Sequence, residues 1–398
     1  MAGGEEQDGK IRVLTVGFGA LGALYSFLLE RGGQASVTAL ARSNYDTVVE
    51  HGITIDSKKY GVHTAWRPSK VVRSEAEARE AGPYDYVLST YKIVPEVRPT
   101  SDVLKPMLAP PASGTRGPVL VFVENGIGIE DEPHDTLCVR ERLAATVVSC
   151  CAWIGANLVD GGTRVEHGPV ETLEMGLFPR ASPGPDDDWR RQALDRFARA
   201  YNAGEGVANV VEDVQPARWK KLLWNTAWGG LSTLSRQPVS VIVSDDNWAY
   251  TFPVVRKIML EVLFVARACG LGEDRVPSSV VDQVFGFTAD SSPVRLRQGA
   301  KSTTTLTDSF KPSLLLDLEA GRPMELEAIV HNVVQRARWH NVETPRLDLM
   351  LAALRPAQMQ SVAREIERRG GAATPAAAPS SSQHQDPSLL PSGMPVEF

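Results

Sequence analysis

The chain has 398 residues, of which 43% are hydrophobic and 23% charged, and its formal net charge is −6. These values are typical of a globular protein with more than one domain, and they exclude a fibrous or wholly disordered chain. A net negative charge gives no overall attraction to nucleic acid or to acidic membranes, so we expect neither as a partner. An anionic ligand must instead meet local positive charge.

The four cysteines, Cys138, Cys150, Cys151 and Cys269, show no C-x-x-C spacing, and the seven histidines are scattered. This pattern favours free thiols in a reducing compartment and argues against a disulfide framework or a metal site. The polar N-terminus has no apolar signal core, and glycines interrupt the longest apolar run, 14–29. We therefore predict a cytoplasmic protein without a membrane span.

A glycine-rich turn stands near the start of the chain. A β-forming run at 12–16 leads into it, helix formers follow at 23–30, and a second strand is expected at 37–41. Strand, glycine turn, helix and strand form the context in which G-x-G-x-x-G binds the pyrophosphate of a dinucleotide, through backbone N–H groups at a helix N-terminus. The predicted cofactor-binding residues are Gly17, Phe18, Gly19, Ala20, Leu21 and Gly22.

The end of the second strand indicates which dinucleotide binds. NAD-specific sites place an acidic residue there to bind the ribose 2′-hydroxyl, whereas this chain has Arg42 followed by Ser43. A guanidinium pairs well with a 2′-phosphate, although a solvated surface arginine is the alternative. The predicted cofactor is NADPH.

Two further β-forming runs, 86–90 and 119–123, end close to Lys92 and to Asn125-Gly126. In an open parallel sheet, ligands bind beyond the carboxyl ends of the strands, so both side chains are expected on the rim that carries the glycine turn. The alternatives are a solvated loop lysine and an asparagine that only serves a tight Asn-Gly turn.

The pattern of residues along the chain then changes. Alternating strands are expected between 143 and 176, extending the sheet with antiparallel members, and helical patterns dominate from 217 to about 361. We predict an α/β Rossmann domain over 10–214 and an all-α domain over 215–365. Composition predicts disorder in the short N-terminus, 1–9, and in the Ala-, Pro- and Ser-rich tail, 366–398.

One helical segment of the second domain carries candidate chemistry. Lys221, Asn225 and Gly229 recur at intervals of four within 218–229, which predicts one stripe of a continuous helix. A cation and an amide one turn apart can protonate an oxygen and orient its carrier. A solvated surface lysine is the alternative.

The motifs that belong together are, in chain order, the glycine run at 17–22, Lys92 after a strand, Glu124-Asn125-Gly126, Trp219-Lys220-Lys221-Leu222-x-x-Asn225, and Pro312-Ser313-Leu314-Leu315-Leu316-Asp317 leading to Gly321-Arg322-Pro323-Met324-Glu325. Over residues 10–357 they resemble the ketopantoate reductase (2-dehydropantoate 2-reductase) family. The resemblance implies a Rossmann domain, an all-helical domain and a cleft between them, with NADPH reducing a 2-keto acid to a 2-hydroxy acid.

The resemblance also implies roles for single residues. Lys221 matches the general acid and Glu325 the glutamate near the substrate hydroxyl, and both are expected to be catalytic. Asn225, Ser313 and Asn125 are expected to bind substrate; Lys92, with Asn125, is expected at the cofactor. From the residues alone, Ser313 is also a plausible helix cap and Glu325 an acid near a helix start.

One position departs from the family pattern. Gly229 stands where a second substrate asparagine is common, which removes an amide and opens space. The expected reaction is reduction of 2-dehydropantoate to pantoate, in pantothenate biosynthesis. The alternatives are a same-fold reductase of a different carbonyl substrate and a non-catalytic NADP(H)-binding sensor. A homodimer is the expected assembly if the chain is not a monomer.

Overall fold

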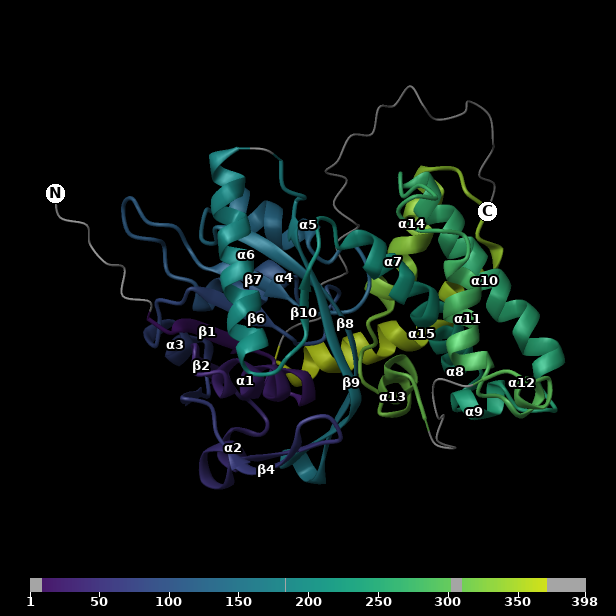
Figure 1. Cartoon of the computed structure of the whole chain (residues 1–398), viewed down its shortest axis with the longest axis horizontal. Coiled ribbons are helices and arrows are strands. Elements are labelled where there is room, and N and C mark those ends of the chain that lie inside the picture. The colour runs from purple at the N-terminus through teal and green to yellow at the C-terminus, as the bar shows by residue number, and fades with distance from the viewer. Residues whose placement is uncertain (1–8, 183, 302–309, 371–398) are drawn as a thin grey trace.

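The computed structural model describes residues 9–182, 184–301 and 310–370, and it consists of a sheet-containing N-terminal half and a helical C-terminal half (Figure 1). Most of the two segments predicted to be disordered, 1–9 and 366–398, lies outside the described residues. The last helix, however, continues to Arg368, three residues beyond the predicted end of the helical domain.

A single ten-stranded sheet organises the N-terminal half, and its strand order is β4-β3-β9-β8-β7-β6-β1-β2-β5, with β10 beside β9. The strands are β1 (Ile11–Val16), β2 (Ala35–Leu40), β3 (Ile53–Ser57), β4 (Gly61–Trp66), β5 (Lys70–Val72), β6 (Tyr86–Ser89), β7 (Val119–Phe122), β8 (Thr146–Val159), β9 (Arg164–Phe178) and β10 (Ala208–Val210). The strands from β5 to β8 run parallel, which is the Rossmann arrangement and confirms the predicted fold class.

The predicted antiparallel extension of the sheet is correct in part. β9 pairs antiparallel with β8, but β8 itself lies parallel to β7. β3, β4 and β5 were not predicted, because they are short and β4 is largely exposed, so their apolar patterns are weak.

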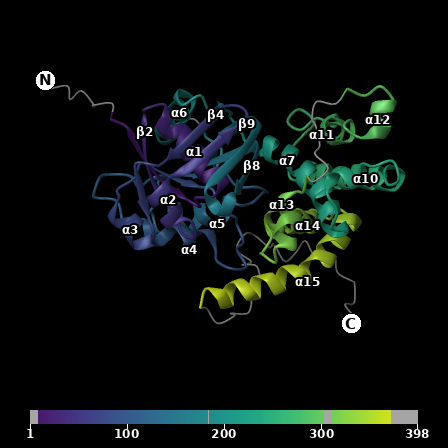
Figure 2. The same cartoon turned by 90° about the horizontal axis from the view of Figure 1, so that it is seen from below.

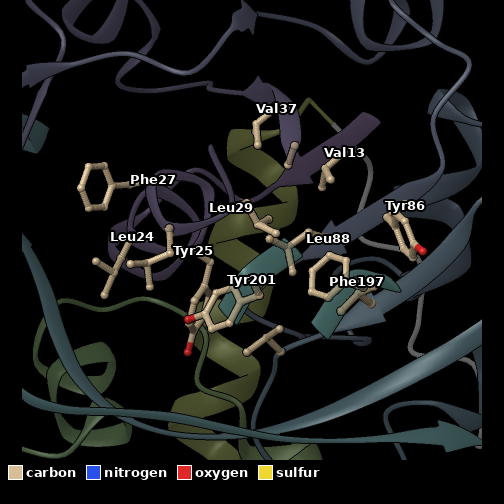
Figure 3. Close-up of a cluster of buried hydrophobic side chains, with 14 of the residues drawn as sticks. Val13, Leu24, Tyr25, Phe27, Leu29, Val37, Tyr86, Leu88, Phe197 and Tyr201 are labelled. Carbon is tan, nitrogen blue, oxygen red and sulfur yellow. The ribbon is translucent and has the colours of Figure 1, made fainter. Parts of the chain in front are cut away.

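Both faces of the parallel strands are covered, which explains why β6 and β7 are buried along their whole length. Alternate strand residues contribute to two apolar clusters on opposite faces. Figure 3 shows one of them, in which Leu24 and Tyr25 of the first helix lie with Leu88 of β6 and with Phe197 and Tyr201 of a later helix.

The helices of this half are α1 (Ala20–Arg31), α2 (Tyr45–His51), α3 (Glu75–Glu80), α4 (Thr100–Leu104), α5 (Asp131–Pro133) and α6 (Pro185–Ala203). α1 and α6 supply the first cluster, and α3 and α4 supply the second. α1 ends at Arg31, before Gly32-Gly33, as the sequence predicts.

The C-terminal half packs around α10, whose buried residues contact several neighbouring helices. Its helices are α7 (Gln215–Trp224), α8 (Gly230–Ser235), α9 (Val239–Ile242), α10 (Trp248–Ala268), α11 (Val280–Ala289), α12 (Pro293–Arg297), α13 (Ser313–Glu319), α14 (Asn332–Trp339) and α15 (Pro345–Arg368). Figure 2 shows α15 leaving this half and extending along the lower edge of the picture, beneath α4 and α5 of the sheet-containing half. Among the described residues, no helix is both long and apolar enough to cross a membrane.

Candidate active site

In the glycine turn between β1 and α1, each glycine is needed for a different physical reason. Gly17 has φ +96°, and a Cβ there would lie 2.5 Å from the backbone N of Tyr91. A Cβ on Gly22 would lie 2.2 Å from the carbonyl oxygen of Gly17. A Cβ on Gly19 would meet no atom within 4 Å, so this position opens onto free space.

Side chains from neighbouring segments hold the glycine turn through hydrogen bonds. The Thr90 hydroxyl donates a 2.8 Å hydrogen bond to the carbonyl of Gly17, and buried Asn44 donates one of 3.0 Å to the carbonyl of Phe18. No side chain caps the N-terminus of α1, so its first N–H groups are available to an anion. Together with the open space beside Gly19, these features fit the pyrophosphate of a dinucleotide.

Two charged residues predicted at the cofactor lie at the carboxyl ends of parallel strands. Arg42 follows β2, its side chain is half exposed, and its nearest acidic partner is Glu75, at 3.8 Å. Lys92 follows β6, and its ammonium pairs with the buried carboxylate of Asp317 on α13. Lys92 therefore links the two halves of the chain.

The helix predicted over 218–229 is interrupted. α7 ends at Trp224, a π-helical segment, η4, covers Asn225–Gly229, and α8 follows. A π turn holds more residues than an α turn and shifts the following side chains around the axis, so the predicted three-residue stripe is wrong at its end. Lys221 and Asn225 do line one small cavity, but Gly229 is buried against Pro312 instead.

The same cavity is lined by residues of both halves, because Glu124, Asn125, Gly126 and Cys151 of the sheet-containing half complete it. Within it, the ammonium of Lys221 donates a 2.8 Å hydrogen bond to Oδ1 of Asn125. The amide of Asn125 in turn donates a 3.1 Å bond to Glu325 Oε2. Three of the predicted site residues thus form a continuous chain of hydrogen bonds.

Burial shifts the pKa of both ionisable ends of this chain. It lowers the pKa of Lys221, which the charge of Arg218 lowers further and the charge of Glu325 opposes. It raises the pKa of Glu325, while the hydrogen bond from Asn125 and the charges of Lys92 and Lys221 act in the opposite direction. A lysine with a lowered pKa is a better proton donor than a free one, because its pKa comes closer to the working pH.

The Asn-Gly turn also forms one of the contacts between the halves. Gly126 has φ +90°, and a Cβ there would lie 2.3 Å from the carbonyl oxygen of Ala328. The backbone N–H of Ile127 donates a 3.1 Å bond to that same oxygen. Asn332 adds a 2.8 Å bond to the carbonyl of Ile127. The turn therefore needs its glycine both for its conformation and for this close approach.

Arg218 is a site residue that sequence reasoning missed. Its buried guanidinium donates to the carbonyls of Glu124 and Gly126, at 2.9 and 3.1 Å, and pairs with Glu130 at 2.8 Å. Arg218 lies on the helix that carries Lys221, and through these bonds it acts as a clamp on the turn that carries Asn125. Its place one turn before Lys221 was visible in the sequence, but nothing there showed that it points inward.

Comparison with protein families shows which family this chain belongs to. Residues 13–180 match the family model described as "Ketopantoate reductase PanE/ApbA", and residues 213–358 match its C-terminal counterpart. The chain belongs to the ketopantoate reductase family. Its fold is that of the family's NAD(P)-dependent oxidoreductases.

Individual relatives agree with this assignment over most of their length. An uncharacterized protein of Saccharomyces cerevisiae is 29% identical over 85% of this chain and 91% of its own. A 2-dehydropantoate 2-reductase of a Nostoc species is 25% identical over 85% of this chain and 93% of its own. The crystal structure of a 2-dehydropantoate 2-reductase from Methylococcus capsulatus superposes with a TM-score of 0.69 at 28% identity, covering 88% of this chain and 98% of that one.

The serine of the family motif lies apart from the hydrogen-bonded chain. Ser313 is exposed at the first turn of α13, and within the described ranges no hydrogen bond joins it to Lys221, Asn125 or Glu325. Its side chain does not cap the helix either, since Pro312 occupies the cap position. Ser313 is therefore free to meet a ligand.

Proposed function

We propose that this member of the family is an NADPH-dependent reductase that converts a 2-keto acid to a 2-hydroxy acid, with 2-dehydropantoate as the first candidate substrate and pantoate as its product. The observation that carries the proposal is the hydrogen-bonded chain from Lys221 through Asn125 to Glu325. The half-buried Lys221 lies beside the loop that follows β7, on the rim that carries the glycine turn.

The cofactor and Lys221 supply different parts of the reaction. Bound NADPH supplies a hydride to the carbonyl carbon. As the C=O bond becomes C–O⁻, the ammonium of Lys221 stabilises the new negative charge and transfers a proton to the oxygen, completing the alcohol. Lys221 is left neutral and recovers its proton from solvent. Burial lowers the pKa of Lys221 and so favours this transfer.

The other site residues bind and orient. Asn225 shares the cavity with Lys221 and offers an amide to the keto acid. Asn125 holds the ammonium in place, and Glu325 fixes the amide of Asn125 so that its oxygen faces Lys221. Ser313 is proposed to bind the substrate from α13. The glycine turn, Arg42 and Lys92 are proposed to bind the cofactor.

Gly229 supports the alternative that the acyl group of the substrate differs from that of 2-dehydropantoate. A Cβ added there would lie 3.7 Å from Pro312, an ordinary contact, so the backbone leaves room at this position. The position lacks the asparagine amide that the family often has, beside Pro312, the residue before Ser313. The second candidate function is therefore reduction of another 2-keto acid in a specialised pathway.

The decisive experiment follows NADPH oxidation by the purified protein against a panel of 2-keto acids, including 2-dehydropantoate. Turnover of at least one keto acid by the wild type, lost in Lys221→Ala, supports the proposal. No turnover of any of them, with NADPH binding intact, would favour the non-catalytic sensor. The same preparation tests a homodimer through its mass in solution.

The proposed location is the cytoplasm. All four cysteines are free, as is usual for proteins of a reducing compartment.

A further inference from the structure

Glu124 is a buried ionisable residue in the cavity that Lys221 and Asn225 also line. It stands two residues after β7, and only 6% of its surface is exposed. The hydroxyl of Ser89, the last residue of β6, donates a hydrogen bond to Oε1 of Glu124. In the part of the chain that the structure describes, the buried Oε2 has no hydrogen-bond partner. A buried polar atom without a partner is unfavourable, and a ligand in the cavity can supply one.

The carboxyl group of Glu124 also lacks a cation. Arg218 pairs with Glu130 at 2.8 Å, and its bond to Glu124 goes to the backbone carbonyl, not to the carboxyl group. The ammonium of Lys221 donates its hydrogen bond to Asn125. Within the described ranges, no ion pair includes the carboxyl group of Glu124. The two cations that line the cavity are therefore already used by other groups.

A buried carboxyl group without a cation is more stable with a proton than without one. Burial raises the pKa of Glu124 well above its usual range, and the charges of Glu325 and Glu130 raise it further. The hydrogen bond from Ser89 and the charge of Arg218 act in the opposite direction. Because Oε1 accepts the bond from Ser89, the proton belongs on Oε2. Glu124 therefore has a neutral O–H donor on the oxygen that has no partner.

We propose that Glu124 is a substrate-binding residue, a neutral carboxylic acid that donates a hydrogen bond from Oε2 to the carboxylate of the keto acid. A neutral donor fits this position because an ionised glutamate would repel an anionic substrate. Lys221 then remains available for the keto oxygen, which it protonates. The inference rests on the proposed function for the class of ligand. It goes further by giving the carboxylate of the substrate a contact on the sheet-containing half.

Two substitutions of similar size test the donor. Glu124→Gln keeps an N–H donor and an acceptor for Ser89 without a charge, whereas Glu124→Met fills the same space and offers neither. With the keto acid that the wild type reduces best, kcat/KM should stay within about threefold of the wild type in Glu124→Gln. It should fall about tenfold or more in Glu124→Met, as for the loss of one hydrogen bond to a charged group. The dissociation constant of NADPH, measured by fluorescence titration, should stay within about twofold in both variants.

Three further measurements distinguish substrate binding from a structural role. The melting temperature should be retained in both variants, because neither leaves an unpaired buried charge. Difference infrared spectra of the wild type and Glu124→Gln at neutral pH should show the C=O band of a carboxylic acid, not the bands of a carboxylate. The matched control is Glu132→Met, because Glu132 also accepts a serine hydroxyl, from Ser101, but is exposed and lines a different cavity. Its kinetics with the keto acid should equal those of the wild type.

The outcomes separate the inference from the proposed function. Binding of oxamate, an unreactive analogue of a 2-keto acid, to the NADPH complex is a readout that needs no turnover. If the wild type binds oxamate but reduces no keto acid, and Glu124→Met weakens oxamate binding about tenfold, the inference stands and the proposed reaction fails. If the wild type turns over and Glu124→Met keeps its kcat/KM, or if the infrared bands are those of a carboxylate, the inference is overturned and the proposed reaction stands. Weaker NADPH binding in Glu124→Met would place the contact at the cofactor and also overturn the inference. If the wild type neither binds oxamate nor reduces a keto acid, both fail.

Discussion

The ammonium of Lys221, on a helix of the C-terminal half, lies 2.8 Å from Oδ1 of Asn125, on a loop of the N-terminal half. This hydrogen bond joins two motifs that are 96 residues apart in the sequence. It also means that the proposed proton donor is positioned by a residue at the proposed cofactor rim. Substitutions at and around this bond therefore test the proposed reaction directly.

Replacing Lys221 with alanine removes the proposed proton donor. We expect kcat to fall about 100-fold or more, as for the loss of a positioned general acid, while the dissociation constant for NADPH stays near its wild-type value. Steady-state kinetics and fluorescence titration measure the two quantities. Lys220, which is exposed on the same helix, is the matched control, and Lys220→Ala should keep its activity. A Lys221→Ala protein that turns over at the wild-type rate would remove Lys221 from the mechanism.

The pH dependence of activity should report the pKa of Lys221. Burial lowers this pKa, so the proton donor is present below the lowered value and is lost as the pH rises through it. The charge of Glu325 opposes the shift. Glu325→Gln keeps an acceptor for Asn125 but removes the charge, so the basic limb of kcat/KM should move to lower pH.

The control for this shift is Glu327→Gln. Glu327 is two residues away but lines a different cavity, with Glu96 and Arg355. Its substitution should leave the basic limb in place. An unchanged limb in Glu325→Gln would show that Glu325 does not influence the protonation of Lys221.

Gly19 and Gly22 should respond differently to the same substitution. Gly19→Ala adds a methyl group where the protein itself has no atom within 4 Å, so thermal stability should be unchanged while NADPH binding weakens at least about tenfold. Gly22→Ala places its methyl group 2.2 Å from the carbonyl oxygen of Gly17 and should lower the melting temperature. Thermal denaturation and cofactor titration distinguish the two effects. Full NADPH affinity in Gly19→Ala would argue against a pyrophosphate at this turn.

Arg218→Met should destabilise the protein by about 3–5 kcal/mol, because it leaves Glu130 buried without its ionic partner. It also removes the donors that hold the carbonyls of Glu124 and Gly126. The free energy of unfolding in denaturant measures the effect. A matched surface change, Arg256→Met, breaks only an exposed ion pair with Asp282 and should cost less than about 1 kcal/mol. Equal losses in the two variants would contradict the clamp described for Arg218.

Local patterns were sufficient to predict much of the fold. The β1–α1–β2 unit follows from β-forming residues, a glycine turn with a distinct spacing and a helix stop, all within about thirty residues. β3 and β4 were missed because a short strand with an exposed partner lacks a continuous apolar pattern. The π turn at Asn225–Gly229 was missed because a spacing of four residues assumes an unbroken α-helix.

The site was predictable only where residue type and motif carried the information. Lys221, Asn125 and Glu325 came from motifs, but their direct connection depends on contact between the halves, which no local pattern contains. Arg218 shows the limit most clearly. An arginine is usually exposed, and its burial here is possible only because Glu130 and several backbone carbonyls, from distant parts of the chain, surround it.

The contact between Gly126 and Ala328 has a mechanical consequence. Because backbone meets backbone there, no side chain can slip into a new rotamer and let one half slide past the other. Rotation of one half about this point would instead widen the space between the halves and leave the hydrogen bond from Ile127 to Ala328 intact. Such an opening would break the bonds that cross between the halves beside the pivot, from Lys221 to Asn125, from Asn125 to Glu325 and from Lys92 to Asp317, and reclosing would restore the donor to the same position.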